Sequence, residues 1–539
     1  TFVNETNPED ARTGNFIISS LGGGTTRILS NSTLTIAQSV NWNQDISGEG
    51  SLTKAGAGTL RLNGDNTYTG GTFVNEGTLV GDTASLQGDI VNGAAIVFEQ
   101  ETDGTYSGNL SDTGTLTKTG EGKLTLAGNS AHSGTTTVSQ GTLQVNTVTM
   151  IGNLINDALV IWDQLTEGEH NGDISGSGII EKTGAGTLRL LGNSSYTGGT
   201  LVSEGTLQGT TNSLQGDIEN NAAVVFDQSF AGSYSGVMSG TGTLTKSGSG
   251  ALTLAGANTY SGGTFVEGGS LIGDTSSLQG HISTNATLIF NQTSNGTFNG
   301  SLAGSGSLQK NGAGTLTLDG QHIFTGSTFV NAGTLRLNAY LGGTLNVANQ
   351  ARLTGWGYVD GPATIGGIHA PGDPVGSQHF GGNLTYNGGA VIELDFLSLH
   401  LPVLQLSDAV IEAGFDQIFV NGDLTFAGST LLSLSFNGLG SSINWNDLMW
   451  AEDQMWTIFV VNGEISGIEN VTVADATWLD GNGVNLRSIY GGAYFSVSVD
   501  GNEVHLNYHS AIPEPSTYAA LLGLGALALV AYRRRRAMA

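Results

Sequence analysis

Short runs of alternating apolar and polar residues recur along most of the chain, as in TLRLNG at residues 59–64 and TFVNEGTLVG at residues 72–81. A period of two residues predicts short β-strands with one buried face. Gly and Asn residues separate the runs and supply the left-handed or bulged backbone that tight turns need. Helical periodicity is absent from these runs, so the pattern predicts an all-β fold.

The strand pattern repeats at a constant spacing of sixty-four positions, without insertion or deletion, in blocks that begin at Gly50, Gly114, Gly178, Gly242 and Gly306. Each block carries a lysine at its fifth position: Lys54, Lys118, Lys182, Lys246 and Lys310. Between the blocks, aromatic residues recur at Phe98, Trp162, Phe226 and Phe290. We expect the array to cover residues 17–337, after an N-terminal entry segment at residues 1–16.

The repeat length favours a solenoid. Sixty-four residues divide into three coils of about 21, which is enough for three short strands and their turns, and spacing without insertions suits coils that stack directly on one another. The alternative is a propeller with one blade per repeat. Propeller blades carry bulkier strands than this Gly- and Thr-rich pattern, so we favour a parallel β-helix.

The sequence after the array remains β-rich but less regular. Residues 338–400 are predicted to form closing coils, and residues 401–510 a β-rich cap of the sandwich type. Four of the seven tryptophans lie in this second segment: Trp445, Trp450, Trp456 and Trp478. The cap interpretation buries them, and the alternative is a carbohydrate-binding platform.

The repeat block follows the pattern GTLTKxGxGxLTLxGxNTYxGGTxVxxGTL. This pattern resembles the autotransporter-associated β-strand repeat of bacterial surface proteins. The resemblance implies that the β-helix is right-handed and that the protein stands on the cell surface.

The last segment, residues 511–539, has a different character. It contains Pro513, Glu514 and Pro515, an apolar run from Tyr518 to Tyr532, and the basic cluster Arg533, Arg534, Arg535 and Arg536. Fifteen helical residues span about 22 Å, and interfacial tyrosines and arginines make up part of the remaining bilayer thickness. The sequence therefore predicts a single transmembrane helix at 518–532, with the arginines in the cytoplasm.

This tail resembles the PEP-CTERM sorting signal. The resemblance implies recognition by an exosortase in a Gram-negative bacterium that makes exopolysaccharide. It also implies transient membrane anchoring, cleavage near Pro513–Pro515, and transfer to the cell surface or extracellular matrix. Such a route needs an export signal, which we expect to have been removed from the N-terminus or to lie outside this sequence.

The charge distribution excludes one class of partner. The formal net charge is −28, and residues 1–512 hold 13 basic against 44 acidic residues. Nucleic-acid binding needs clustered lysine and arginine, so we expect no nucleic-acid partner. The chain has no cysteine, which excludes disulfides and cysteine-based metal or redox chemistry.

Catalytic motifs are not found in the sequence. It has no G-x-S-x-G, H-E-x-x-H, Walker A or EF-hand pattern. The repeated lysines are interpreted as a ladder that offsets the acidic surface. The following residues are interpreted as structural: His132, His170, His281, His322, Asp82, Asp89, Asp217 and Asp274. His505 and His509 are expected on one face of a strand, about 13 Å apart, which is too far to share a metal ion. Residues 355–380 break the repeat, and their Asp360, His369, Asp373 and His379 are the alternative candidates for a site.

These observations predict a non-enzymatic surface or biofilm-matrix protein, adhesive or structural, with no cofactor and no metal. Exosortase, the membrane and exopolysaccharide are the expected partners. The alternative is a β-helical polysaccharide lyase or hydrolase.

Overall fold

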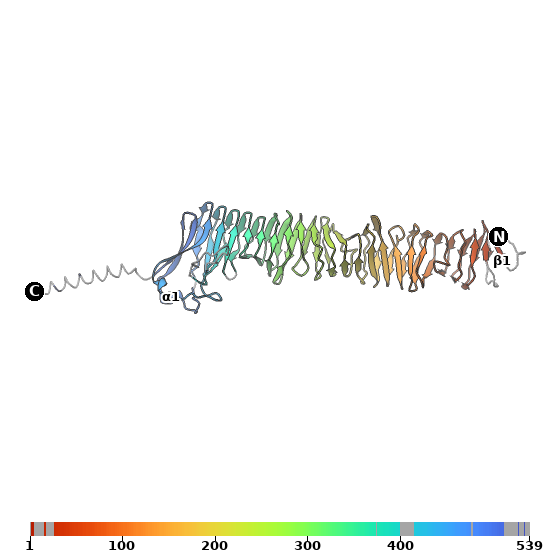
Figure 1. Ribbon diagram of the computed structural model, residues 1–539, viewed down its shortest axis with the longest axis horizontal. Helices are drawn as coiled ribbons and strands as arrows, with labels where there is room; N and C mark the ends of the chain where they lie inside the picture. The colour runs from red at the N-terminus through yellow and green to blue at the C-terminus, as the bar shows by residue number, and fades with distance from the viewer. Residues whose placement is uncertain are drawn as a thin grey trace, which may run out of the picture. The chain divides into compact units, whose positions relative to one another are not determined.

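The computed structural model describes residues 2–4, 16–17, 26–372, 375–398, 414–475 and 478–510, together with Leu527 and Arg533. It divides into two units, the first made of residues 1–272 and 276–282, the second of residues 273–275 and 283–539. In each unit, short strands stack in parallel from one turn of the chain to the next (Figure 1). The predicted all-β parallel β-helix is confirmed.

Parallel sheets form the sides of the first unit. One contains β2 (Phe16–Ile17), β4 (Thr33–Ile36), β7 (Ser51–Lys54), β9 (Thr72–Val74), β11 (Ile90–Asn92), β14 (Leu110–Asp112) and β17 (Ala131–His132). The next contains β5 (Val40–Trp42), β8 (Thr59–Leu62), β10 (Thr78–Gly81), β12 (Ala95–Glu99), β15 (Thr115–Thr119), β18 (Thr136–Val138), β20 (Leu154–Asn156) and β23 (Ile174–Ser175). A third contains β13 (Gly104–Tyr106), β16 (Lys123–Leu126), β19 (Thr142–Val145), β21 (Leu159–Asp163), β24 (Ile179–Thr183), β26 (Thr200–Val202), β28 (Ile218–Asn220) and β31 (Met238–Ser239).

In later turns of the first unit, a fourth sheet forms the side that the first sheet forms in the earlier turns. Its strands in this unit are β22 (Gly168–His170), β25 (Thr187–Leu190), β27 (Thr206–Gly209), β29 (Ala223–Asp227), β32 (Thr243–Ser247) and β34 (Thr264–Val266).

Each turn is shorter than the repeat length predicts. Leu60 lies opposite Leu79, Leu79 opposite Ile96, and Ile96 opposite Leu116, so successive turns advance by nineteen, seventeen and twenty positions. One copy of the repeat therefore exceeds three turns. The prediction of three coils per repeat is wrong, because tight corners shorten the coil.

Because one copy of the repeat is longer than three turns, equivalent residues of successive copies lie on different sides of the coil. Three steps up the sheet that contains Lys118 lead through Val138 and Asn156 to β23. The equivalent Lys182 lies in the next strand, β24, which belongs to the neighbouring sheet. One repeat is thus three turns plus one side.

The interior follows the alternation of each strand. In β15, Leu116 and Lys118 are buried, and the three threonines between and around them point outward. Aromatic residues eight positions apart in the sequence contact each other inside, as Phe98 and Tyr106 do at 5.2 Å. Close stacking also demands glycine at the corners, since a Cβ on Gly134 would lie 1.7 Å from the carbonyl oxygen of Gly114.

The second unit continues the parallel pattern. One of its ladders contains β37 (Thr287–Asn291), β40 (Ser307–Asn311), β43 (Ser327–Val330), β46 (Leu345–Val347), β49 (Ala363–Ile365), β52 (Leu384–Tyr386), β55 (Leu424–Phe426) and β58 (Ile465–Ser466). Leu384 lies opposite Leu424, and Leu424 opposite Ile465, so the last two turns are about twice as long, at forty and forty-one positions. Parallel pairing thus goes on beyond residue 400, through β59 (Val471–Val473), which pairs with β56 (Thr430–Ser435). This differs from the sandwich expected for residues 401–510.

Antiparallel pairing closes one end of an eight-stranded sheet whose other described pairs are parallel. β57 (Gln454–Val461) pairs with β61 (Glu503–His509), which pairs with β60 (Tyr494–Asp500). The three-residue β59 and the single helical turn α1 (Leu486–Ile489) precede this hairpin in the sequence. Antiparallel strands at this position occupy an edge that would otherwise be free to pair with another chain.

The tryptophans of this segment are core residues. Trp450 is fully buried, lies 4.5 Å from Trp445 and 5.8 Å from Trp456 between ring centres, and its carbonyl accepts a 2.9 Å hydrogen bond from the Tyr508 hydroxyl. Trp478 is buried as well. The alternative of a carbohydrate platform is wrong, because the rings pack against each other.

Candidate functional site

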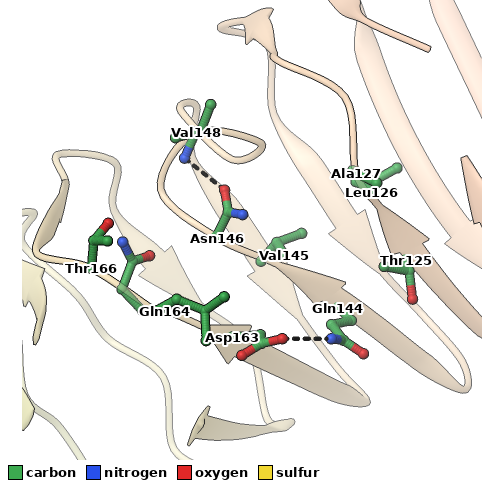
Figure 2. A pocket seen from close by; sticks show the side chains of 11 residues that line it. Thr125, Leu126, Ala127, Gln144, Val145, Asn146, Val148, Asp163, Gln164 and Thr166 are labelled. Atoms are coloured by element: carbon green, nitrogen blue, oxygen red, sulfur yellow. Dashed lines mark hydrogen bonds between the residues drawn. The ribbon is translucent and has the colours of Figure 1, made fainter. Parts of the chain in front are cut away.

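A groove opens on the outside of the first unit, where β16, β19 and β21 run side by side (Figure 2). It has a volume of about 270 Å³. Thr125, Gln144 and Asp163 line its floor from these three strands, and Val148 and Leu165 stand on the loops at its rim. The remaining lining residues are Leu126, Ala127, Val145, Asn146, Gln164 and Thr166.

Hydrogen bonds hold the floor and the rim in place. The Gln144 Nε2 donates to Asp163 Oδ2 at 3.1 Å, and the Val148 amide donates to Asn146 Oδ1 at 2.9 Å, as Figure 2 shows. Gln164 turns inward, where its Oε1 accepts from the Thr147 amide at 3.0 Å. The groove therefore offers a carboxylate, an amide oxygen and threonine hydroxyls between two apolar side chains.

The repeat explains why the groove exists. Thr125 occupies the position of Arg61 in the copy before and of Arg189 in the copy after. Arg61 forms an ion pair with Glu99, and the guanidinium of Arg189 lies 3.9 Å from Asp227. Glu99 and Asp227 are the equivalents of Asp163. In the copy that carries Thr125, the space of an arginine side chain is left open.

The five repeated lysines are buried, with 0–1% of their surface exposed. In Lys118, Nζ donates to the carbonyl oxygens of Thr119, Gly120 and Gln140 at 2.8, 2.6 and 3.1 Å. Lys54, Lys182, Lys246 and Lys310 make the same three bonds, to residues one, two and 22 positions ahead. The last bond joins consecutive turns.

The predicted surface ladder of lysines is therefore wrong. Lys118 follows the buried Leu116 by two residues, so strand alternation points its side chain inward, between Phe98 and Val138. Burial lowers the pKa of each of these lysines, and that of Lys310 falls to about 8. The alternation itself was the signal that sequence reasoning missed.

Among the described residues of the candidate cluster at 355–380, His369 and His379 have separate partners. His369 is buried, with Nδ1 2.6 Å from the Tyr386 hydroxyl and Nε2 2.7 Å from Gln378 Oε1. Burial lowers its pKa to about 4. His379 instead stacks on Phe419 at 4.6 Å. Asp360 lies close to Tyr340, and Asp373 lies outside the described residues.

The other histidines have separate surroundings. His132, His170 and His322 are buried, and burial lowers the pKa of each. His281 is exposed. His505 lies 3.2 Å from the Thr457 hydroxyl, and His509 lies 2.8 Å from the Ser496 hydroxyl, so each has its own partner. Among the residues that the structure describes, no group of three or more His, Asp or Glu side chains could hold a metal ion.

The repeated aspartates do more than shape local turns. Asp82 accepts from the amides of Ala84 and Ser85 in its own turn. Asp89 and Asp217 instead accept from Asn109 and Val237, each 20 residues ahead on the next turn. Asp274, the fourth member of this predicted set, also has an interaction partner. These carboxylates help to hold neighbouring coils in register.

Most of the predicted sorting residues lie outside the described part of the chain: Pro513, Glu514, Pro515, Tyr518, Tyr532, Arg534, Arg535 and Arg536. Arg533 and Leu527 are described as helical and exposed. Within the described residues, no helix combines the length and the hydropathy needed to cross a bilayer. The transmembrane helix expected at 518–532 stays a prediction.

Comparison with known families defines the class of protein. The passenger-associated transport repeat matches residues 52–80, 116–145, 180–208, 244–272 and 308–337, and the PEP-CTERM protein-sorting motif matches residues 511–536. Both resemblances seen in the sequence are confirmed. The chain is an exported β-helical repeat protein with a PEP-CTERM sorting signal, which implies processing by an exosortase, a membrane protein.

Three relatives complete this assignment. The chain is 31% identical over 365 residues to the adhesin BmaC autotransporter of Brucella suis biovar 1 (strain 1330), covering 53% of this chain and 10% of the relative. It is 46% identical over 68 residues to an extracellular serine protease of Serratia marcescens, covering 13% and 6%. It is 29% identical over 265 residues to the uncharacterized lipoprotein YdeK of Escherichia coli (strain K12), covering 42% and 20%.

The chain thus spans at most a fifth of the length of these relatives. The sorting signal together with the adhesin relative places the protein at the cell surface of a Gram-negative bacterium.

Proposed function

We propose that the chain is a non-enzymatic, adhesive or structural component of the cell surface or biofilm matrix. The observation that carries this proposal is the union of five transport repeats, which build coils without insertion, with a sorting motif at residues 511–536. Repetition of one coil pattern yields long, uniform, threonine- and asparagine-rich sides. Such sides suit many weak contacts with a matrix.

The relative named as an adhesin supports the adhesive reading, since the matched segment covers 53% of this chain. Exopolysaccharide is the matrix partner that we propose, because the polar sides offer hydroxyl and amide groups for hydrogen bonding. The tail anchors the protein transiently through residues 518–532, with Arg533 to Arg536 on the cytoplasmic side, until exosortase cleaves near Pro513–Pro515.

The first experiment measures the intact mass and maps the C-terminal peptide of the mature protein from its native host. We expect a chain that ends near Pro513–Pro515. A mature chain that retains Arg533 to Arg536 would contradict cleavage and leave an anchored protein.

The second experiment compares a deletion strain with strains that express the full chain or a chain ending at Ser510. We expect surface retention and biofilm mass to recover only with the full chain.

Purified protein is also incubated with the host's exopolysaccharide. Release of new reducing ends would contradict the non-enzymatic proposal and favour a polysaccharide lyase or hydrolase.

A further inference from the structure

We propose that the groove formed by β16, β19 and β21 binds the guanidinium group of an arginine side chain from a partner polypeptide. Asp163, labelled in Figure 2, would accept the guanidinium hydrogen bonds. Val148 and Leu165 would pack against the aliphatic stem. This site is independent of sorting and of binding to polysaccharide.

The neighbouring copies of the repeat supply the first argument. In the copy with Arg189, Gln208 donates to Asp227 Oδ2 at 3.2 Å, as Gln144 donates to Asp163 Oδ2 at 3.1 Å. The Arg189 guanidinium lies 3.9 Å from that same Asp227 oxygen. The same carboxylate, held by the same amide, therefore receives a guanidinium when the repeat supplies one.

The contacts of Arg189 and Arg61 show how many carboxylates are needed to bind a guanidinium group at this position of the repeat. Arg189 also lies 3.2 Å from Glu167 and 3.6 Å from Glu169, and Arg61 forms an ion pair with Glu99 alone. One carboxylate is thus enough to hold the guanidinium. Arginine suits such a site better than lysine, because its planar fork matches the two oxygens of a carboxylate.

The rim of the groove supplies the second argument. Val148 and Leu165 are 52% and 72% exposed. In the copy that carries Arg189, the equivalent positions are Asn212 and Ser229. Apolar rim residues thus accompany the missing arginine in this copy. They offer an incoming side chain the aliphatic contacts that an arginine stem can use.

Charge around the groove is compatible with a cation. The buried Lys182 interacts electrostatically with Asp163. In the next copy, Lys246 interacts in the same way with Asp227, and Asp227 still forms an ion pair with Arg189. The chain as a whole carries a net charge of −28. Long-range attraction therefore favours the approach of a basic partner.

The test uses the full chain in detergent micelles, with ¹³C-labelled valine and leucine methyl groups. Acetyl-Gly-Arg-Gly-amide is titrated while the methyl resonances of Val148 and Leu165 are followed. The neutral isostere acetyl-Gly-citrulline-Gly-amide is titrated in parallel. We expect the arginine peptide to shift both resonances with a dissociation constant of about 1 mM, and the citrulline peptide to bind at least about tenfold more weakly.

Three variants define the site. Thr125→Arg should abolish binding, because an internal guanidinium then fills the groove, and Asp163→Asn should weaken binding about tenfold. Thr253→Arg is the matched control: it adds the same charge at the equivalent position of another copy, where Asn291 replaces the carboxylate, and should leave binding unchanged. Unchanged methyl resonances outside the groove would verify the fold of the unbound variants.

Equal binding of the arginine and citrulline peptides would overturn the proposal. So would undiminished binding by the Thr125→Arg variant, or the absence of any arginine-dependent shift at about 10 mM peptide, tenfold above the expected dissociation constant. A lysine peptide that binds as tightly as the arginine peptide would overturn the choice of guanidinium.

Discussion

Replacing Lys118 by Met tests whether the buried lysines hold consecutive turns together. Methionine keeps an unbranched chain of similar length but removes the ammonium. The carbonyl oxygens of Thr119, Gly120 and Gln140 then lose the donor that lies 2.6 to 3.1 Å away. Gln140 belongs to the next turn, so the bond that joins the two coils is lost.

The size of the effect follows from two opposing terms. Each buried carbonyl left without its donor costs about 1–3 kcal/mol. The variant no longer buries an ammonium, which returns several kcal/mol. With three carbonyls affected, their combined loss exceeds this return, and we expect the local free energy of opening to fall by about 3 kcal/mol.

Hydrogen exchange is the appropriate assay, because a solenoid opens locally and exchange resolves the individual coil that contains the change. Amides of residues 116–145 should exchange about 100-fold faster in Lys118→Met than in the parent protein. Lys123→Met in the adjacent β16 is the matched control, since Lys123 lies on the outer side of its strand. It should change the opening free energy by less than about 0.5 kcal/mol. Exchange within threefold of the parent in Lys118→Met would refute the reasoning.

Three further predictions concern acid, base and packing. The pKa of Lys310 is about 8 in the folded protein and about 10.4 in the unfolded chain, so the unfolded chain binds the additional proton at pH values between these two. The free energy of unfolding should therefore rise with pH over this interval. Lys310→Met should flatten that rise in denaturant titrations at pH 8 and 10. The folded pKa of His369 is about 4 and its unfolded value about 6.5, so stability should fall by about 3 kcal/mol as pH drops between these values. His369→Gln should remove that loss in denaturant titrations at pH 7 and 4, and an unchanged acid loss would show that another group causes it. Gly134→Ala should destabilise the first unit, because its Cβ would lie 1.7 Å from the carbonyl oxygen of Gly114. Gly388→Ala is the control in thermal unfolding, since its nearest neighbour would lie 3.8 Å away.

Strand alternation and the repeat length were sufficient to predict the solenoid, because each short strand buries every second residue. The same alternation could have placed Lys118 inside, two residues after Leu116. A surface position was expected for these lysines instead, as a ladder that offsets the acidic charge. The three backbone carbonyls that receive it come from corners whose geometry appears only when the turns are stacked.

The groove could be predicted only in part. Alignment of the copies shows Thr125 where Arg61 and Arg189 stand. The sequence does not show that each arginine reaches a carboxylate two turns away. Arg61 crosses the intervening strand beside Val80, and Arg189 crosses it beside Gln208. That reach follows from the short turns that the strand pairing defines.

A repeat of three turns plus one side distributes equivalent residues around the coil of the first unit. Three consecutive copies place their lysines in three different sheets: Lys54 in β7, Lys118 in β15 and Lys182 in β24. Each lysine bonds to a carbonyl 22 positions ahead, so these bonds between turns are made in successive sheets. The load that they bear is therefore shared among the sides of the coil and is not concentrated along a single seam.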